Sequence, residues 1–201
     1  MSEPRQFPTL KRLLFRVHKD LDRIVSRYPW PAYRDLSDLE VIVILLEDRR
    51  FFQHYGIDLK SLAREFARMI TFRRFGGAST IDMQYVRTST GYRTRTLRRK
   101  LYEMMLAFLL QFRMTKLAIL KSYMQEVYLG SGLHGIESAS WSLFEKPAFE
   151  LSRDQAALLA AMMVYPRPLT PSARWKEKVD LRAAYGLRLF TELGGRYKQR
   201  F

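Results

Sequence analysis

The chain has 201 residues, 47% of them hydrophobic, which is enough for one domain with a buried core and argues against disorder. The absence of cysteine excludes a disulfide scaffold and a thiolate metal site. A balance of 35 basic against 20 acidic residues gives a net charge of +15, which favours a phosphate-bearing partner: nucleic acid, an anionic membrane or a phosphorylated substrate.

No membrane span and no signal peptide are predicted. The longest purely aliphatic run, residues 41–46, is far shorter than the ~20 residues of a spanning helix. Residues 1–20 lack the apolar centre of a signal peptide. The chain is therefore expected to be soluble or peripheral on a membrane.

Helical periodicity dominates the sequence and no convincing strand alternation is found, so the predicted fold class is all-α. Residues 1–36 are predicted as a lead-in to a single domain, 1–201. Ser37 and Glu40 have the spacing of a capping box and open a helix that runs towards Arg50. Further helices are predicted at 58–72, 79–88, 95–113, 115–128, 136–144, 152–163 and 172–193.

The first predicted helix ends on two carboxylates, Glu47 and Asp48, which Arg49 and Arg50 follow. A carboxylate beside a low-dielectric core is harder to ionise, so Glu47 is a candidate to take or give a proton near neutral pH. The alternative is a solvated helix end at which the two acids pair with the two arginines, and position alone favours it.

The next predicted helix belongs to a basic, amphipathic segment, 59–75. Its apolar residues share one face, while Lys60, Arg64 and Arg68 form a stripe at spacing four. Two interpretations stay open. The segment is either a surface helix packed on the core or a helix that lies on an anionic bilayer.

A predicted helix N-terminus follows the glycine pair at 76–77. Ser79 and Thr80 open this helix, and Thr80, Gln84 and Arg87 share one of its faces. Free N–H groups and hydroxyls at a helix N-terminus can bind an anion. An ordinary capped helix is the commoner explanation for a single case.

A row of charged side chains follows on the predicted helix 95–113. Arg95, Arg99 and Glu103 recur at spacing four, with Lys100 beside them. Two guanidiniums on one face suit the oxygens of a phosphate group, and the carboxylate lies at the end of the row. The alternative is an exposed Arg–Glu pair of little energetic value.

Two further sequence patterns are not expected to form a binding site. Gly130, Gly132 and Gly135 match G-x-G-x-x-G, but the preceding segment is helical, so a helix stop and a tight turn are predicted in place of a dinucleotide site. The histidines are widely separated and lack zinc-binding spacing: His18, His54 and His134.

Taken together, the segments from 37 to 172 resemble one family, the peptidoglycan glycosyltransferases of family 51, found in penicillin-binding proteins and monofunctional transglycosylases. "GGASTIDMQYVR" is similar to the family's second motif, and "ILKSYMQ" to its fourth. The third motif, R-K-x-x-E, is met by Arg99, Lys100 and Glu103. The first motif, E-D-x-x-F-x-x-H-x-G, is met in full by Glu47, Asp48, Phe51, His54 and Gly56.

The resemblance implies a lysozyme-like, two-lobed helical fold and an inverting hexosyltransferase that polymerises lipid II into β-1,4 glycan and releases undecaprenyl pyrophosphate. It implies that Glu47 is the general base and that Glu103 assists at the donor site. It also implies a pyrophosphate site, whose candidate residues are Ser79, Thr80, Gln84, Arg87, Arg95, Arg99 and Lys100.

The same resemblance implies the partners and the location. A divalent cation, Mg²⁺ or Mn²⁺, is the candidate cofactor, and no organic cofactor is expected. The expected partners are lipid II, the growing glycan strand, an anionic membrane surface and other cell-wall synthesis proteins, with no nucleic acid. The expected location is the outer, periplasmic face of the cytoplasmic membrane, and the segment 59–75 is expected to touch that membrane.

The sequence departs from the family pattern at several positions. Asp82 and Met83 stand where the second motif usually has Thr and Gln, which is expected to add a carboxylate near the pyrophosphate site. Arg87 replaces the family's lysine, and Lys121 and Gln125 replace Glu and Asn of the fourth motif. No S-x-x-K motif of a penicillin-binding half is present, so a monofunctional enzyme is expected.

Two alternatives to the polymerase stay open from the sequence. One is a divergent, weakly active or non-catalytic module that binds lipid-linked pyrophosphate saccharides at the membrane. The other is a lysozyme-like glycan hydrolase, because two carboxylates on a helical fold can cleave glycosidic bonds.

Overall fold

The computed structural model describes residues 10–27, 35–70, 79–94 and 96–198. The described chain is almost entirely helical, which confirms the all-α prediction. Its helices are α1 (Leu10–Val25), α2 (Asp38–Glu47), α3 (Leu59–Ile70), α4 (Ile81–Thr90), α5 (Leu97–Leu110), α6 (Lys116–Glu126), α7 (Ile136–Phe144), α8 (Arg153–Met162) and α9 (Ala173–Lys198).

Each helix expected between 37 and 193 is present, with small shifts at its ends. The capping box of α2 is confirmed, because the Glu40 amide donates to Ser37 Oγ (3.2 Å) and the Ser37 amide donates to Glu40 Oε2 (2.7 Å). Thr80 caps α4 and Ser152 caps α8 in the same way. Local side-chain hydrogen bonds therefore set where these helices begin.

Two features of the fold differ from the prediction. The lead-in contains α1, which packs against α4 and α5 and buries Val17, Leu21 and Ile24. A two-stranded antiparallel sheet, β1 (Tyr128–Gly130) and β2 (Leu133–His134), occupies the glycine motif after α6. These strands are too short for alternation to be visible in the sequence.

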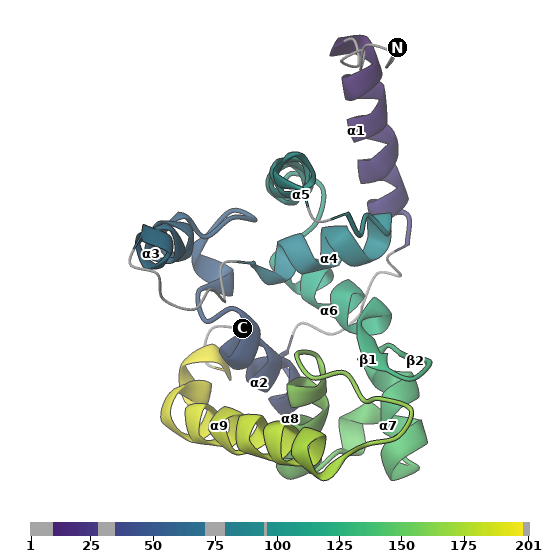
Figure 1. Ribbon diagram of the computed structural model, residues 1–201, viewed down its shortest axis with the longest axis vertical. Helices are drawn as coiled ribbons and strands as arrows, with labels where there is room; N and C mark the ends of the chain where they lie inside the picture. Colours follow the sequence, from purple (N-terminus) through teal and green to yellow (C-terminus); the bar gives the residue numbers. More distant parts are fainter. Residues whose placement is uncertain (1–9, 28–34, 71–78, 95, 199–201) are drawn as a thin grey trace.

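The helices form two groups, as expected for a lysozyme-like fold (Figure 1). In one group α2 packs between α8 and α9, and α2 is apolar on all sides, with every residue from Leu39 to Leu45 buried. In the other group α4 packs on α5, α6 and α1. The last residue of α2, Glu47, lies at the junction of the two groups, because its side chain bonds to Gln84 of α4.

The turn after α2 is docked tightly on α5. Gly56 has φ +77°, and a Cβ at this position would lie 2.8 Å from the Phe108 nitrogen and closer still to the Ala107 oxygen. Only glycine combines this backbone conformation with this approach. The turn that carries the first motif is therefore fixed against the helix that carries the third.

Candidate active site

Glu47 is an almost buried carboxylate held at both oxygens. Its side chain is 9% exposed, Oε1 accepts from Nη2 of Arg182 on α9 (2.9 Å), and Oε2 accepts from Nε2 of Gln84 on α4 (3.1 Å). Arg49 instead bonds to the Leu45 carbonyl. The interpretation of a solvated helix end paired with its neighbouring arginines is therefore wrong for Glu47.

Asp48 and His54 tie the turn to the start of α4. Asp48 Oδ2 lies 2.9 Å from His54 Nε2 and accepts from the Ile81 amide at 3.2 Å. Both side chains are buried, and Phe51 beside them is fully buried. These contacts hold the turn in place.

Asp82 does not add its charge to the proposed pyrophosphate site, so that expectation is wrong. Its side chain is fully buried and accepts from Lys116 Nζ at 2.8 and 3.0 Å and from Gln111 Nε2 at 2.8 Å. Burial raises the pKa of Asp82, against the pull of the Lys116 ammonium. The substitution is thus compensated inside the core.

The two hydroxyl groups at the start of α4 have different partners. Thr80 is buried, donates to the Gly56 carbonyl (2.6 Å) and accepts from the Met83 amide, so its hydroxyl is used within the fold. Ser79 is half-buried and accepts from Lys100 Nζ (2.8 Å). Ser79 is therefore the hydroxyl of this pair that lies next to a cation.

Gln84 and Arg87 continue along α4. Gln84 accepts from the Tyr123 hydroxyl (2.7 Å) while its amide donates to Glu47, so its orientation is fixed from both sides. Arg87 is half-buried one turn further on. The two residues line one cavity, as their shared helical face predicts.

Glu103 lies between two cations of its own helix. Its side chain is 4% exposed, with Arg99 Nη1 at 2.7 Å and Lys100 Nζ at 3.1 Å. Burial lowers the pKa of Lys100, although Glu103 opposes this shift. The cluster is buried, which excludes the exposed Arg–Glu pair. Arg95 lies outside the described residues.

Glu47 and Glu103 line different cavities. The cavity at Glu47 has a volume of about 440 Å³, and Ser79 and Thr80 also line it. The rest of its charged wall is mixed, with four arginines, Arg49, Arg50, Arg64 and Arg68, beside Asp48, Asp58 and Glu65. Glu103 lines a small space of about 10 Å³ with Arg87 and Arg99. Helix α4 connects the two carboxylates, since Gln84 contacts Glu47 and Ser79 contacts Lys100.

Another cavity, of about 940 Å³, is lined by residues of α4 and α6. It shares Arg87 with the space at Glu103. Many of its lining side chains are polar or basic, among them Arg27, Gln84, Arg87, Arg93, Tyr123, Gln125 and His134. Because Gln84 bonds to Glu47 and Arg87 lines the space at Glu103, this cavity adjoins both carboxylates.

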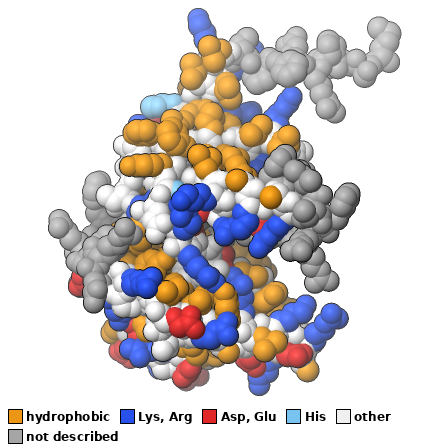
Figure 2. Space-filling model, turned by 90° about the vertical axis from the view of Figure 1, so that its left-hand side faces the viewer, with side chains coloured by type: hydrophobic (Ala, Val, Ile, Leu, Met, Phe, Trp, Pro, Cys, Tyr) orange, Lys and Arg blue, Asp and Glu red, His pale blue; other side chains and the backbone are white. Residues whose placement is uncertain are grey.

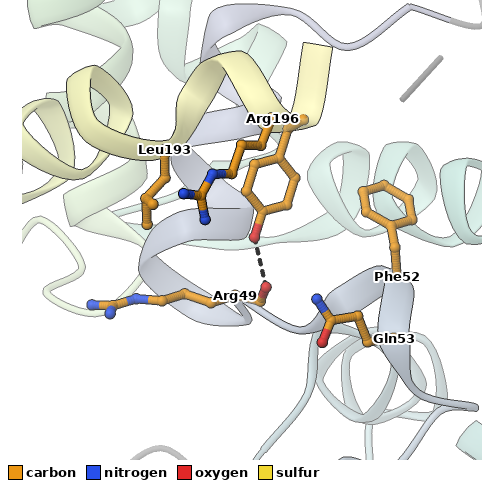
Figure 3. Close-up of a pocket in the computed structure, with 6 residues that line it drawn as sticks. Arg49, Phe52, Gln53, Leu193 and Arg196 are labelled. Atoms are coloured by element: carbon orange, nitrogen blue, oxygen red, sulfur yellow. Dashed lines mark hydrogen bonds between the residues drawn. The ribbon is translucent and has the colours of Figure 1, made fainter. Parts of the chain in front are cut away.

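A fourth cavity of about 410 Å³ separates the turn after α2 from the end of α9 (Figure 3). Arg49, Phe52 and Gln53 line it from the turn, and Leu193 and Arg196 line it from the helix. The hydroxyl of Tyr197 donates to the Arg49 carbonyl (2.6 Å) across this gap. The final helix thus contacts the turn of the first motif.

The described residues do not fit a divalent cation. Asp48, His54 and Asp82 are close enough to share a metal, but the Lys116 ammonium already contacts Asp82 and lies 3.5 Å from His54 Nδ1. Glu103 is already neutralised by Arg99 and Lys100. No step is therefore assigned to a metal.

The sequence interpretation missed three residues of this site: Arg182, Tyr123 and Lys116. Arg182 lies 135 residues from Glu47 and outside the recognised motifs. No local pattern indicates such a partner, because the contact depends on how α9 packs on α2.

Comparison with known proteins assigns the chain to a family. Residues 21–190 match the model of the transglycosylase family. A transglycosylase of Cupriavidus necator is 34% identical over 96% of this chain and 80% of that protein. The biosynthetic peptidoglycan transglycosylase of Escherichia coli is 34% identical over 86% of this chain and 72% of that protein. Penicillin-binding protein 1A of Aquifex aeolicus is 38% identical over 64% of this chain but only 18% of its own length.

The family match covers both helix groups and every motif residue described above. It also extends beyond the recognised motifs to Arg182, the partner of Glu47. The chain therefore belongs to the transglycosylase family of glycosyltransferases.

Proposed function

We propose that this glycosyltransferase polymerises lipid II into β-1,4-linked peptidoglycan with inversion at the donor sugar. The observation that carries the proposal is Glu47, a carboxylate held at both oxygens beside a cavity whose lining includes four arginines. A base fixed in orientation beside a cavity is the arrangement that this transfer needs. The names of the Escherichia coli and Cupriavidus necator relatives support it.

In the proposed reaction, Glu47 takes the proton from the acceptor 4-hydroxyl as that oxygen attacks the anomeric carbon of the donor. The new C–O bond forms while the bond from that carbon to the pyrophosphate oxygen breaks, and the electron pair leaves with undecaprenyl pyrophosphate. Arg87, Arg99 and Lys100 would stabilise the developing negative charge. Arg95 and Ser79 complete the proposed pyrophosphate site.

Glu103 has a different role from Glu47 in this proposal. Its two carboxylate oxygens contact Arg99 and Lys100. Its proposed task is to hold both cations at the donor pyrophosphate. A lysozyme-like hydrolase would instead need a carboxyl group free to donate a proton to the leaving group.

The proposed site of action is the outer face of the cytoplasmic membrane. None of the described helices has the length and apolar character to cross a bilayer. Helix α5 presents exposed apolar side chains on one face, Leu97, Leu101 and Phe108, with Phe112 just beyond its end. Figure 2 shows hydrophobic side chains gathered on the upper half of this side of the molecule, with basic ones beside them. Such a surface suits an anionic bilayer.

The expected contact of segment 59–75 with the membrane is only partly described. Helix α3 covers Leu59–Ile70, with Leu59, Lys60 and Arg64 exposed, whereas 71–75 lie outside the described residues. The exposed apolar side chains of α5 extend the proposed membrane-binding surface beyond this segment.

The test is incubation of the chain and its Glu47→Gln variant with lipid II, with products sized on a gel. Glu47→Gln should lose polymerisation by about 10²–10⁴-fold, because the amide cannot take the proton. Glu192→Gln, at an exposed position on α9, is the matched control and should polymerise normally. Full activity of Glu47→Gln, or binding of lipid II without product by the unaltered chain, would overturn the proposal.

The metal requirement stays a separate prediction. Polymerisation measured in EDTA, Mg²⁺ and Mn²⁺ decides it. A strict requirement would favour a metal bound to the substrate pyrophosphate, since Glu103 and Asp82 already have cationic partners.

A further inference from the structure

The final helix is seated closely on the helix that ends at Glu47. A Cβ at Gly186 of α9 would lie 3.0 Å from Leu46 Cδ1 and 3.2 Å from Ile42 Cγ2, so the absence of a side chain lets the two helices approach. Arg182 lies one turn before Gly186 on the same face of α9. This close packing directs the Arg182 side chain to the C-terminal end of α2.

Arg182 binds two oxygens there with a single nitrogen. Its Nη2 lies 2.9 Å from Glu47 Oε1 and 3.1 Å from the Leu46 carbonyl oxygen. The carbonyls in the last turn of a helix lack intrahelical donors and carry partial negative charge, so a cation is favoured at this position. Because one guanidinium binds both the backbone and the side chain, it fixes the carboxylate relative to its own helix.

The pair is shielded from water. The Arg182 side chain is 23% exposed and that of Glu47 is 9% exposed. Among the described residues, Arg182 is the cation that forms an ion pair with Glu47. Arg182 holds the Oε1 atom of Glu47. The Oε2 atom, which accepts from Gln84, is therefore left to receive the proton from the acceptor hydroxyl.

We propose that Arg182 is a positioning residue that holds the Glu47 carboxylate in the orientation for proton abstraction, which makes the C-terminal helix part of the catalytic apparatus. This inference rests on the proposed role of Glu47 as the base. Arg182 acts through Glu47 and is not itself assigned to the substrate.

The test compares Arg182→Gln and Arg182→Lys with Arg174→Gln. Arg174 is exposed near the start of the same helix, so its replacement removes the same charge without touching Glu47. The kcat and KM of lipid II polymerisation are measured for each protein. Arg182→Gln should lower kcat by about tenfold with a smaller effect on KM, because the base is misoriented while substrate binding is kept.

Arg182→Lys keeps the charge but cannot reproduce the guanidinium contacts. It should lose less kcat than Arg182→Gln, because a cation is kept at the end of α2. Arg174→Gln should match the unaltered chain in both kcat and KM. A purely structural role for Arg182 predicts reduced thermal stability with kcat unchanged at temperatures where the variants are folded, and that result would overturn the inference.

A second measurement separates this inference from the proposed function. Thermal unfolding midpoints are compared for Arg182→Gln, Glu47→Gln and the double variant. A direct contact predicts that the double variant loses less than the sum of the single losses. If the double variant shows this coupling but the unaltered chain fails to polymerise lipid II, the proposed function is refuted and the inference about Arg182 is not. Additive losses would refute the Arg182 contact whatever the activity.

Discussion

At the scale of single residues, the charged groups of the site are held by partners from other parts of the chain. Glu47 contacts α4 and α9, and Lys100 links Ser79 to Glu103. A side chain with two fixed partners has little rotamer freedom left to lose when substrate binds. The geometry of the site is therefore largely established before the substrate arrives.

The buried pair of Asp82 and Lys116 gives a prediction about stability. Lys116→Met leaves a fully buried carboxylate without its cation, which should cost about 3–5 kcal/mol of unfolding free energy. The double variant Asp82→Asn with Lys116→Met should recover most of this loss. Urea unfolding at constant pH measures both, with Lys176→Met on the exposed face of α9 as the control.

The same pair predicts the pH dependence of the Lys116→Met variant. Burial already raises the pKa of Asp82 above its ordinary value of 3.8, and loss of the ammonium raises it further. The folded state then keeps a proton that the unfolded chain releases. Unfolding free energy should therefore fall as pH rises from about 4 through the raised pKa of Asp82. A stability that instead increases over this range would show that Asp82 is not buried as described.

At the scale of elements, helix ends and tight turns place the site. Glu47 is the last residue of α2, the Thr80 cap opens α4, and the turn between them is docked on α5 through Gly56. The Asp48–His54 contact and the bond from Thr80 to the Gly56 carbonyl hold this turn from both sides. Glu47, the proposed base, is thus positioned by contacts between the ends of these elements.

Gly56 and Gly91 form a matched pair for testing this arrangement. Both have positive φ, +77° and +70°, but only Gly56 would place a Cβ against another backbone, while Gly91 has open space. Gly91→Ala should cost about 1–2 kcal/mol from backbone strain. Gly56→Ala should add about 1–3 kcal/mol of overpacking and also reduce polymerisation. Denaturant unfolding compares the two, and equal losses would mean that the turn is not docked as described.

At the scale of the whole molecule, basic charge and exposed apolar surface occur together. The net charge is +15, and exposed Leu97, Leu101 and Phe112 lie on or next to α5. Charge attracts the protein to an anionic surface over a distance of about one Debye length, and apolar side chains then bind at short range. Lipid-linked substrates would be reached most readily from such a surface.

The corresponding prediction concerns vesicle binding. Leu101→Ser with Phe112→Ser should weaken binding to phosphatidylglycerol vesicles by at least about tenfold, because two apolar side chains no longer enter the bilayer. Leu169→Ser with Phe149→Ser is the matched control, since these residues are at least as exposed but lie outside α5. Co-sedimentation measures both. Equal binding by the two double variants would place the membrane contact elsewhere.

The sequence by itself determined the helices and the family, and it supplied the candidate site residues. These depend on local information: apolar periodicity, capping residues such as Ser37, and short motifs such as the one that begins at Glu47. Tertiary structure alone decided that Arg182 pairs with Glu47, that Asp82 faces Lys116 in the core, and that the two glutamates line separate cavities. These outcomes depend on which helix faces pack together across long stretches of chain, and no local pattern encodes that choice.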